Sequence, residues 1–270
     1  MTTEFSRVLA SITAASDGRL HVVVPPDWLQ GRTVFGGMQM AIAVRGMRAA
    51  MPEETRALPL RSVQMTFVGP LGGGQAIYLR PELLRRGRST SHARCDLLQY
   101  DGVACSAVGI FGVARASQFV HEMPAPDPGK RPEDVAGAVM TPGRAPAFIE
   151  HFEARWAVGA VPFSGYPEPH SMIYARLRDR ECGAEDALLA LADVIPTPVL
   201  SMLTQPTPAS SLSWMVEVLR DPARLDLHGW CLIDTEVRAG TDGYLSQTSV
   251  LYGPDGHAYA VSHQTVGVVG

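Results

Sequence analysis

The feature that most constrains the fold of this chain is an internal repeat. Residues 88–113 and residues 242–269 both read as two strands joined by an Asp-Gly turn, at Asp101 in the first copy and at Asp255 in the second. Two copies of the same supersecondary ending predict two similar units that pack together as one body. A chain of 270 residues is long enough for two such units of ordinary size.

The region before each repeated ending predicts how each unit is built. Residues 35–50 are apolar around most of a helical circumference, so this helix should be buried on most sides. Predicted strands of the first unit are 60–68, 75–84, 88–99 and 103–114. The second unit has predicted strands at 152–158 and 171–177, a helix at 184–194, and strands at 211–219, 228–237, 244–252 and 258–268. A helix followed by a four-stranded meander, twice over, predicts an α+β double hotdog, in which two antiparallel sheets each wrap a central helix.

Prolines mark the boundary between the units. Periodicity disappears between residues 117 and 147, where six prolines accumulate, as is typical of a linker. We therefore expect an N-terminal hotdog unit at 1–116, a Pro-rich linker at 117–147 and a C-terminal hotdog unit at 148–270.

Charge and cysteine content narrow the range of functions that the chain could have. A net charge of −4 gives no general attraction to nucleic acid. The four cysteines show no Cys-x-x-Cys spacing, which argues against a zinc site or a redox pair and favours a reducing cytoplasm. The N-terminus lacks signal-peptide features and no run is long enough to span a membrane, so we expect a soluble cytoplasmic protein.

Polar residues at positions of predicted burial are the candidates for chemistry. The repeat offset of 154 residues places Gln264 opposite Ile110, so an amide stands where the other copy has an aliphatic side chain. A buried amide costs free energy unless it finds partners. Asp193 lies at the end of an apolar stretch, and Ser211 begins a strand in the same unit. A helix end, a strand-start hydroxyl and a backbone hydrogen bond are the structural alternatives for Asp193, Ser211 and Gln264, respectively.

These residue types could position a water molecule for attack on a carbonyl carbon. An aspartate can accept a proton from water, while a hydroxyl and an amide can hold that water in line with the carbonyl carbon. Gly36 and Gly37 open the buried helix, where free backbone N–H groups and the positive end of the dipole favour an oxyanion. A tight turn into the helix is the alternative role of this pair.

Several segments resemble the acyl-CoA thioesterase II family of double-hotdog enzymes. VFGG at 34–37 is similar to the motif that opens the family's helix, TFVGPL at 66–71 to its aromatic-and-proline strand end, and residues 83–94 to its hairpin segment. The resemblance covers nearly the whole chain. It implies Asp193, Ser211 and Gln264 as catalytic residues, Gly36 and Gly37 as substrate-binding or oxyanion residues, and no metal.

The sequence departs from the family's pattern at one strand. The family has Thr-x-Asp where this chain has Ser211-Leu212-Ser213, so the aspartate two positions after the hydroxyl is absent. Ser210 and Ser213 remain alternatives to Ser211.

The resemblance implies hydrolysis of fatty or otherwise hydrophobic acyl-CoA thioesters, in lipid metabolism, without a cofactor. The expected partner is the acyl-CoA substrate. A non-catalytic acyl-CoA or lipid binder is the alternative, and an enoyl-CoA hydratase or dehydratase a lesser one, because that chemistry needs a histidine paired with an aspartate. Both a monomer and a homo-oligomer formed through exposed sheet edges remain open.

Overall fold

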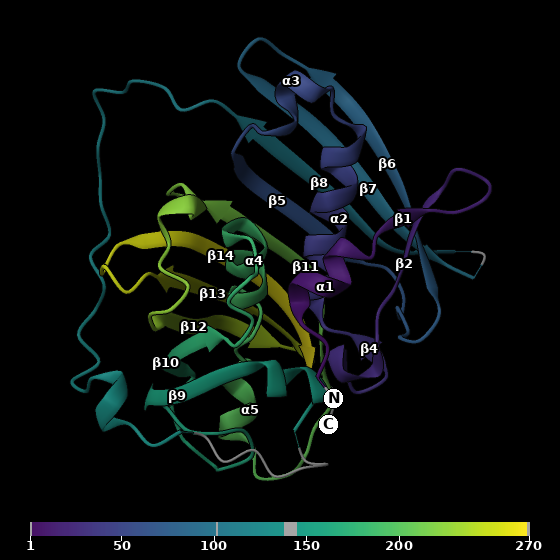
Figure 1. Ribbon diagram of the computed structural model, residues 1–270. Coiled ribbons are helices and arrows are strands. Elements are labelled where there is room, and N and C mark those ends of the chain that lie inside the picture. Colours follow the sequence, from purple (N-terminus) through teal and green to yellow (C-terminus); the bar gives the residue numbers. More distant parts are fainter. Residues whose placement is uncertain (1, 101, 138–144, 269–270) are drawn as a thin grey trace.

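The fold is built on one continuous antiparallel sheet. The computed structural model describes residues 2–100, 102–137 and 145–268. Its main sheet has twelve strands in the order β1-β2-β6-β7-β8-β5-β11-β14-β13-β12-β10-β9 (Figure 1). In the first half these are β1 (Thr13–Ala14), β2 (Leu20–Val23), β5 (Leu60–Phe67), β6 (Ala76–Arg86), β7 (Thr90–Gln99) and β8 (Gly102–Gly112). In the second half they are β9 (Phe152–Val158), β10 (His170–Leu177), β11 (Ala209–Val218), β12 (Cys231–Thr241), β13 (Tyr244–Tyr252) and β14 (Ala258–Val268).

The helices are few, and one of them is almost wholly buried. Besides α2 (Gly36–Ala50), the α-helices are α1 (Phe5–Ala10), α3 (Glu53–Arg56), α4 (Ala184–Leu191) and α5 (Val199–Met202). Short 3-10 segments and a two-stranded ribbon of β3 (Leu29–Gln30) and β4 (Thr33–Val34) complete the elements of the described residues. The predicted central helix corresponds to α2, which packs on β6, β7 and β8. Its apolar side chains are buried around most of its circumference, as the sequence predicts.

The strand order confirms the double hotdog and corrects one detail of it. The order reads the same from either edge, so each strand of the first half has a counterpart in the second, and β5 meets β11 at the centre. The prediction of a simple meander was wrong. β5 pairs with β8 and not with β6, because the glycine-rich segment after β5 carries the chain across the sheet. This crossover brings the first and last strands of each four-stranded unit side by side.

The second central helix is shorter than predicted. α4 ends at Leu191, so Asp193 lies just beyond its last turn. The Asp193 backbone N–H still donates to the Ala190 carbonyl over 3.4 Å. An aspartate in this place can turn its carboxylate away from the helix axis and toward a neighbouring element.

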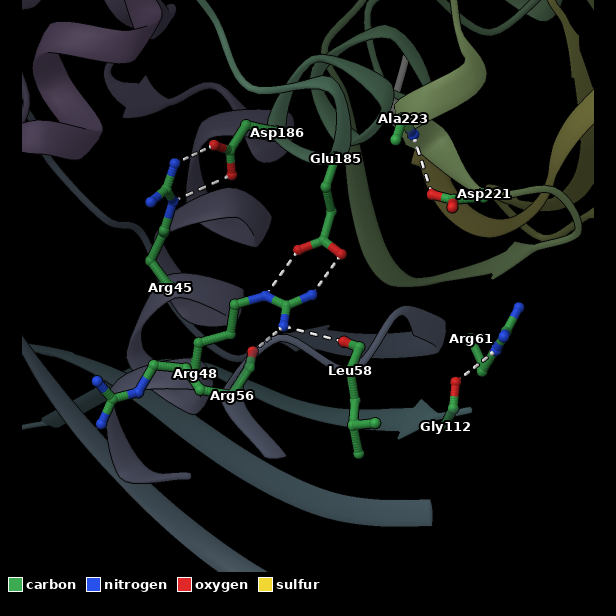
Figure 2. A network of polar contacts seen from close by, with 10 residues as sticks. All are labelled: Arg45, Arg48, Arg56, Leu58, Arg61, Gly112, Glu185, Asp186, Asp221 and Ala223. Carbon is green, nitrogen blue, oxygen red and sulfur yellow. Dashed lines mark hydrogen bonds and ion pairs between the residues drawn. The ribbon is translucent and has the colours of Figure 1, made fainter. Parts of the chain in front are cut away.

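Two pairs of side chains join α2 to α4, as Figure 2 shows. The Arg48 guanidinium donates to both carboxylate oxygens of Glu185, at 2.9 and 2.5 Å, and also to backbone carbonyls before β5. Arg45 forms a second two-pronged pair with Asp186. Both carboxylates lie in the first turn of α4 and Arg48 lies in the last turn of α2, so the helix dipoles favour these charges. These ion pairs link the first half of the chain to the second.

Aromatic side chains fill the space where α2 begins. Phe35 stacks on Phe148 at 4.2 Å between ring centroids, and Trp28 stacks on His151 at 3.7 Å. These contacts join the segment before α2 to the segment that leads into β9. The beginning of α2 is therefore packed tightly against the second half of the chain.

The proline-rich region and the first predicted turn are only partly described. Residues 117–137 run largely without regular structure, with an isolated bridge between Pro124 and His257. Residues 138–144 of the predicted linker lie outside the described residues, as do Asp101 of the first turn and the end of the second unit, residues 269–270. In the part of the chain that is described, no helix combines the length and apolar character needed to cross a membrane.

Candidate active site

The carboxylate of Asp193 lies against the beginning of α2. A Cβ atom built on Gly36 would be only 2.5 Å from Asp193 Oδ2, and the Phe67 ring is also next to Gly36. Glycine is therefore the residue that lets the helix backbone approach the carboxylate. Asp193 comes from the second half of the chain, whereas Gly36 and Phe67 come from the first. The candidate site consequently lies on the seam between the two units.

Gln264 is the side-chain partner of Asp193. It lies on β14 with its side chain on the inner face of the sheet, where it is 9% exposed. Its Nε2 donates a hydrogen bond of 2.7 Å to Asp193 Oδ1. Across the sheet, Gln264 is directly opposite Trp214 of β11, whose indole Nε1 donates to Ser262 Oγ. The amide predicted to need a buried partner therefore has one, and that partner is the predicted aspartate.

The surroundings of Asp193 make its protonation sensitive to pH near neutrality. Desolvation of the partly buried carboxylate raises the pKa of Asp193 from its ordinary value of 3.8 to about 7, because fewer water molecules stabilise the charge. Hydrogen bonds from Gln264 and from the Gly37 backbone act in the opposite direction. Such a carboxylate can exchange a proton with water near pH 7, which suits a general base.

Ser211 lies on the face that carries Gln264, and a bulge in β11 puts it there. Ser211 is paired with Val266, which is two residues beyond Gln264 on the inner face of β14. The register shifts between Ser211 and Ser213, so that Ser213 is opposite Thr265 on the outer face. Residues directly opposite each other in an antiparallel pair share a face, and diagonal neighbours are within reach of side chains. In the described part of the chain, the Ser211 hydroxyl makes no hydrogen bond to Asp193 or Gln264.

The same register bears on the two alternative serines. Ser210 is opposite Gly267 and exposed, and Ser213 faces away from Gln264. Among the three serines only Ser211 therefore shares the inner face with Gln264. An aspartate at position 213 would also face outward in this chain, so its absence removes no group from the vicinity of Asp193.

Gly37 contributes a backbone group to the site. Its backbone N–H acts on the Asp193 carboxylate and lowers the pKa of that group. The N-cap residue of α2, Phe35, makes no side-chain cap hydrogen bond, so the N–H groups of the first turn have no local side-chain acceptor. The N-terminus of α2 thus faces the place where negative charge resides on Asp193.

One buried residue of this site was missed in the sequence. Gln247 on β13 is directly opposite Gln264, is 4% exposed, and its Nε2 donates to Gln264 Oε1 over 2.8 Å. The signal was present, because Leu245, Gln247, Ser249 and Leu251 alternate along the inner face of one strand. The reasoning that selected Gln264 applies equally to Gln247.

A shallow surface hollow lies beside this region. It has a volume of about 420 Å³ and borders the start of β11 and the turn between β12 and β13. Ser210, Leu212 and Tyr244 are among its lining residues, whereas Asp193 and Gln264 are not. The hollow therefore reaches the neighbours of Ser211 without reaching the carboxylate.

Nothing in the described residues resembles a metal centre or a reactive thiol. Within the described ranges, no three His, Cys, Asp or Glu side chains cluster in a way that could hold a metal ion. Burial raises the pKa of Cys95, Cys105 and Cys231 to about 12, so these thiols stay protonated at neutral pH.

Comparisons with known proteins agree with this architecture. A conserved protein of unknown function with the hot dog fold from Alicyclobacillus acidocaldarius has a TM-score of 0.83 at 24% identity, covering 100% of this chain and 99% of that one. The tesB protein of Mycobacterium avium subspecies paratuberculosis scores 0.77 at 18% identity, covering 99% and 100%. Acyl-CoA thioesterase II TesB2 of Mycobacterium marinum scores 0.77 at 15% identity, covering 98% of each chain. No curated protein gives a significant match.

Fold and site together define a double-hotdog protein with a carboxylate and an amide paired where its two units meet. The family membership of the chain is shown by its sequence. Residues 24–112 match the model of the acyl-CoA thioesterase N-terminal domain, and residues 124–268 match that of the acyl-CoA thioesterase C-terminal domain. The chain belongs to this acyl-CoA thioesterase family.

Proposed function

We propose that this protein hydrolyses fatty or otherwise hydrophobic acyl-CoA thioesters, with Asp193 as the general base. The observation that carries the proposal is the hydrogen bond of 2.7 Å from Gln264 to Asp193 at the beginning of a buried helix. Membership in the acyl-CoA thioesterase family supports the same substrate class. The proposed setting is cytoplasmic lipid metabolism.

The proposed reaction uses water as the nucleophile. Asp193 accepts a proton from a water molecule as its oxygen attacks the thioester carbonyl carbon. The tetrahedral intermediate then collapses, the C–S bond breaks, and the departing sulfur takes up the proton held by Asp193. The products are a carboxylic acid and the free thiol of CoA.

The other candidate residues orient this water and stabilise the oxyanion. Ser211 and Gln264 share one face of the sheet, and we assign the Ser211 hydroxyl and the Gln264 amide to holding the attacking water. Fixing the water before reaction lowers the entropic part of the barrier. The positive end of α2 faces the same place, and because the Gly37 N–H already serves Asp193, we assign the nearest oxyanion donor to Gly36.

The proposal is tested by measuring release of CoA thiol from a series of acyl-CoA substrates with a thiol reagent. Asp193→Asn and Gln264→Leu should each lower kcat by about 10²- to 10⁴-fold, the usual range for losing a positioned base or its orienting group. Ser211→Ala should lower kcat, while Ser210→Ala, one residue away on the outer face, should leave kcat within about twofold.

Two results would contradict the proposal. Wild-type rates in Asp193→Asn would remove Asp193 from the reaction. Tight binding of acyl-CoA by calorimetry, with no thiol release by the wild-type protein, would favour the non-catalytic acyl-CoA binder. The pH dependence gives a further check, because kcat should rise with pH through the Asp193 pKa of about 7.

A further inference from the structure

Three side chains form a directional chain of hydrogen bonds across the inner face of the second unit. Gln247 Nε2 donates to Gln264 Oε1 over 2.8 Å, and Gln264 Nε2 donates to Asp193 Oδ1 over 2.7 Å. Both amides are at least nine-tenths buried. This series of hydrogen bonds ends at the Gln247 carbonyl oxygen, which is buried and has no hydrogen-bond partner among the described residues.

The direction of this chain follows from the chemistry of its members. An ionised carboxylate only accepts hydrogen bonds, so Gln264 must present its NH₂ group to Asp193. The Gln264 carbonyl oxygen then faces the opposite way and needs a donor, which the NH₂ group of Gln247 supplies. With its NH₂ group directed at Gln264, Gln247 points its carbonyl oxygen away from that side chain, and no donor among the described residues meets this oxygen. An unpartnered buried acceptor costs about 1–3 kcal/mol, so something must offset it.

We propose that Gln247 is a positioning residue for the hydrolysis: it fixes the amide of Gln264 so that the NH₂ group of Gln264 remains on Asp193. This inference rests on the proposed function and assigns a role to a residue outside the Asp193–Ser211–Gln264 set. Without Gln247, the Gln264 amide can rotate by half a turn and offer its carbonyl oxygen to Asp193. That orientation disfavours the carboxylate and favours the carboxylic acid, which cannot act as a base.

Few groups other than these amides influence the charge of Asp193. The carboxylate lies against Gly36 at the beginning of α2 and accepts a hydrogen bond from the Gln264 amide of β14, and the Gly37 backbone also lowers its pKa. No charged side chain of the described residues contributes to the pKa of Asp193. His263, which directly precedes Gln264 in the sequence, faces outward toward Thr248 and Glu217. The orientation of Gln264 is therefore one of the few structural controls on Asp193.

Two substitutions at Gln247 test the role against simple packing. Gln247→Met keeps the length and unbranched shape of the side chain but removes the donor. We expect kcat to fall about tenfold, KM to stay within about twofold, and the acidic limb of the pH–kcat profile to move up by about one pH unit. Gln247→Glu keeps the shape but accepts from the Gln264 NH₂ group when ionised, so the limb should move at least as far and kcat should fall further.

Thr235→Val is the matched control. Thr235 lies on the neighbouring strand, is fully buried, and its hydroxyl donates to Ser249 Oγ over 2.9 Å without touching Gln264 or Asp193. This variant also removes one buried hydrogen bond from the inner face of the same sheet. It should lower the stability of the protein and leave the position of the acidic limb unchanged. A limb that moves equally in Thr235→Val would overturn the positioning role.

A second readout separates this inference from the proposed function. The pKa of Asp193 can be measured without substrate from its ¹³Cγ chemical shift, assigned by its loss in Asp193→Asn. A higher pKa in Gln247→Met than in the wild type supports the positioning role, and an unchanged pKa refutes it. If the wild-type protein releases no thiol from acyl-CoA, the proposed function fails, and the titration still decides whether Gln247 controls Asp193.

Discussion

The raised pKa of Asp193 predicts that this carboxylate destabilises the protein at the pH where it would act. A shift from 3.8 to about 7 is about 3 pH units, which corresponds to about 4 kcal/mol between the two protonation states. Asp193→Asn keeps the shape of the side chain and removes the charge. The variant should therefore be more stable than the wild type at alkaline pH, by up to about 4 kcal/mol.

The sign of the effect follows from proton binding in the two states. The folded protein binds the Asp193 proton more tightly than the unfolded chain does. The stabilisation from this tighter binding is complete below about pH 4, where both states are protonated, and is lost as the pH rises through about 7. The asparagine variant has no such proton, so its advantage over the wild type should grow with pH over this interval.

Urea unfolding at pH 5 and pH 8 measures this directly. Between these values, the difference in unfolding free energy between variant and wild type should increase by about 3 kcal/mol, since about 2 pH units of the interval lie below the folded pKa. Comparing two pH values cancels any pH-independent effect of the new amide, such as altered pairing with Gln264. A difference that stays constant, or that shrinks as the pH rises, would refute the view that burial suppresses ionisation of Asp193.

Two further substitutions probe the seam between the units. Gly36→Ala places a methyl group 2.5 Å from Asp193 Oδ2, so it should displace the carboxylate, lower kcat at least tenfold and cost about 1–3 kcal/mol of stability. Gly69→Ala, whose new methyl group meets no atom within 4 Å, is the control in the thiol-release and urea-unfolding assays. Arg48→Met removes the two-pronged contact with Glu185 and should lower the unfolding free energy by about 2–3 kcal/mol, measured by urea unfolding; a loss below about 0.5 kcal/mol would contradict a role for this pair in joining the helices.

Much of the architecture was predictable because it depends on patterns that a single sequence displays. The apolar circumference of 35–50 predicts a buried helix, and two similar strand-turn-strand endings predict two similar units. The pairing of β5 with β8 was not predictable in the same way. Strand periodicity shows which side chains face inward, but not which strand a glycine-rich crossover brings alongside.

The candidate site was predictable in its members and not in its geometry. Asp193 and Gln264 were selected because they are polar at positions of predicted burial, and the structure places them in hydrogen-bond contact. Their catalytic roles, and that of Ser211, stay predictions. The bulge that separates the faces of Ser211 and Ser213 leaves no mark in residue types, because either serine could occupy either face. Gln247 was overlooked although its strand shows the same alternation as that of Gln264.

The symmetric strand order gives the chain two equivalent locations, one in each half, and among the described residues the seam at Asp193 is the one that combines a carboxylate with amides. Its components come from both halves: the opening of α2 from one and Asp193 with Gln264 from the other. Neither half would possess a complete set if the polypeptide were cut in the linker and the fragments kept apart. The equivalent location in the first half can thus serve packing alone, while the seam at Asp193 depends on the two halves remaining joined.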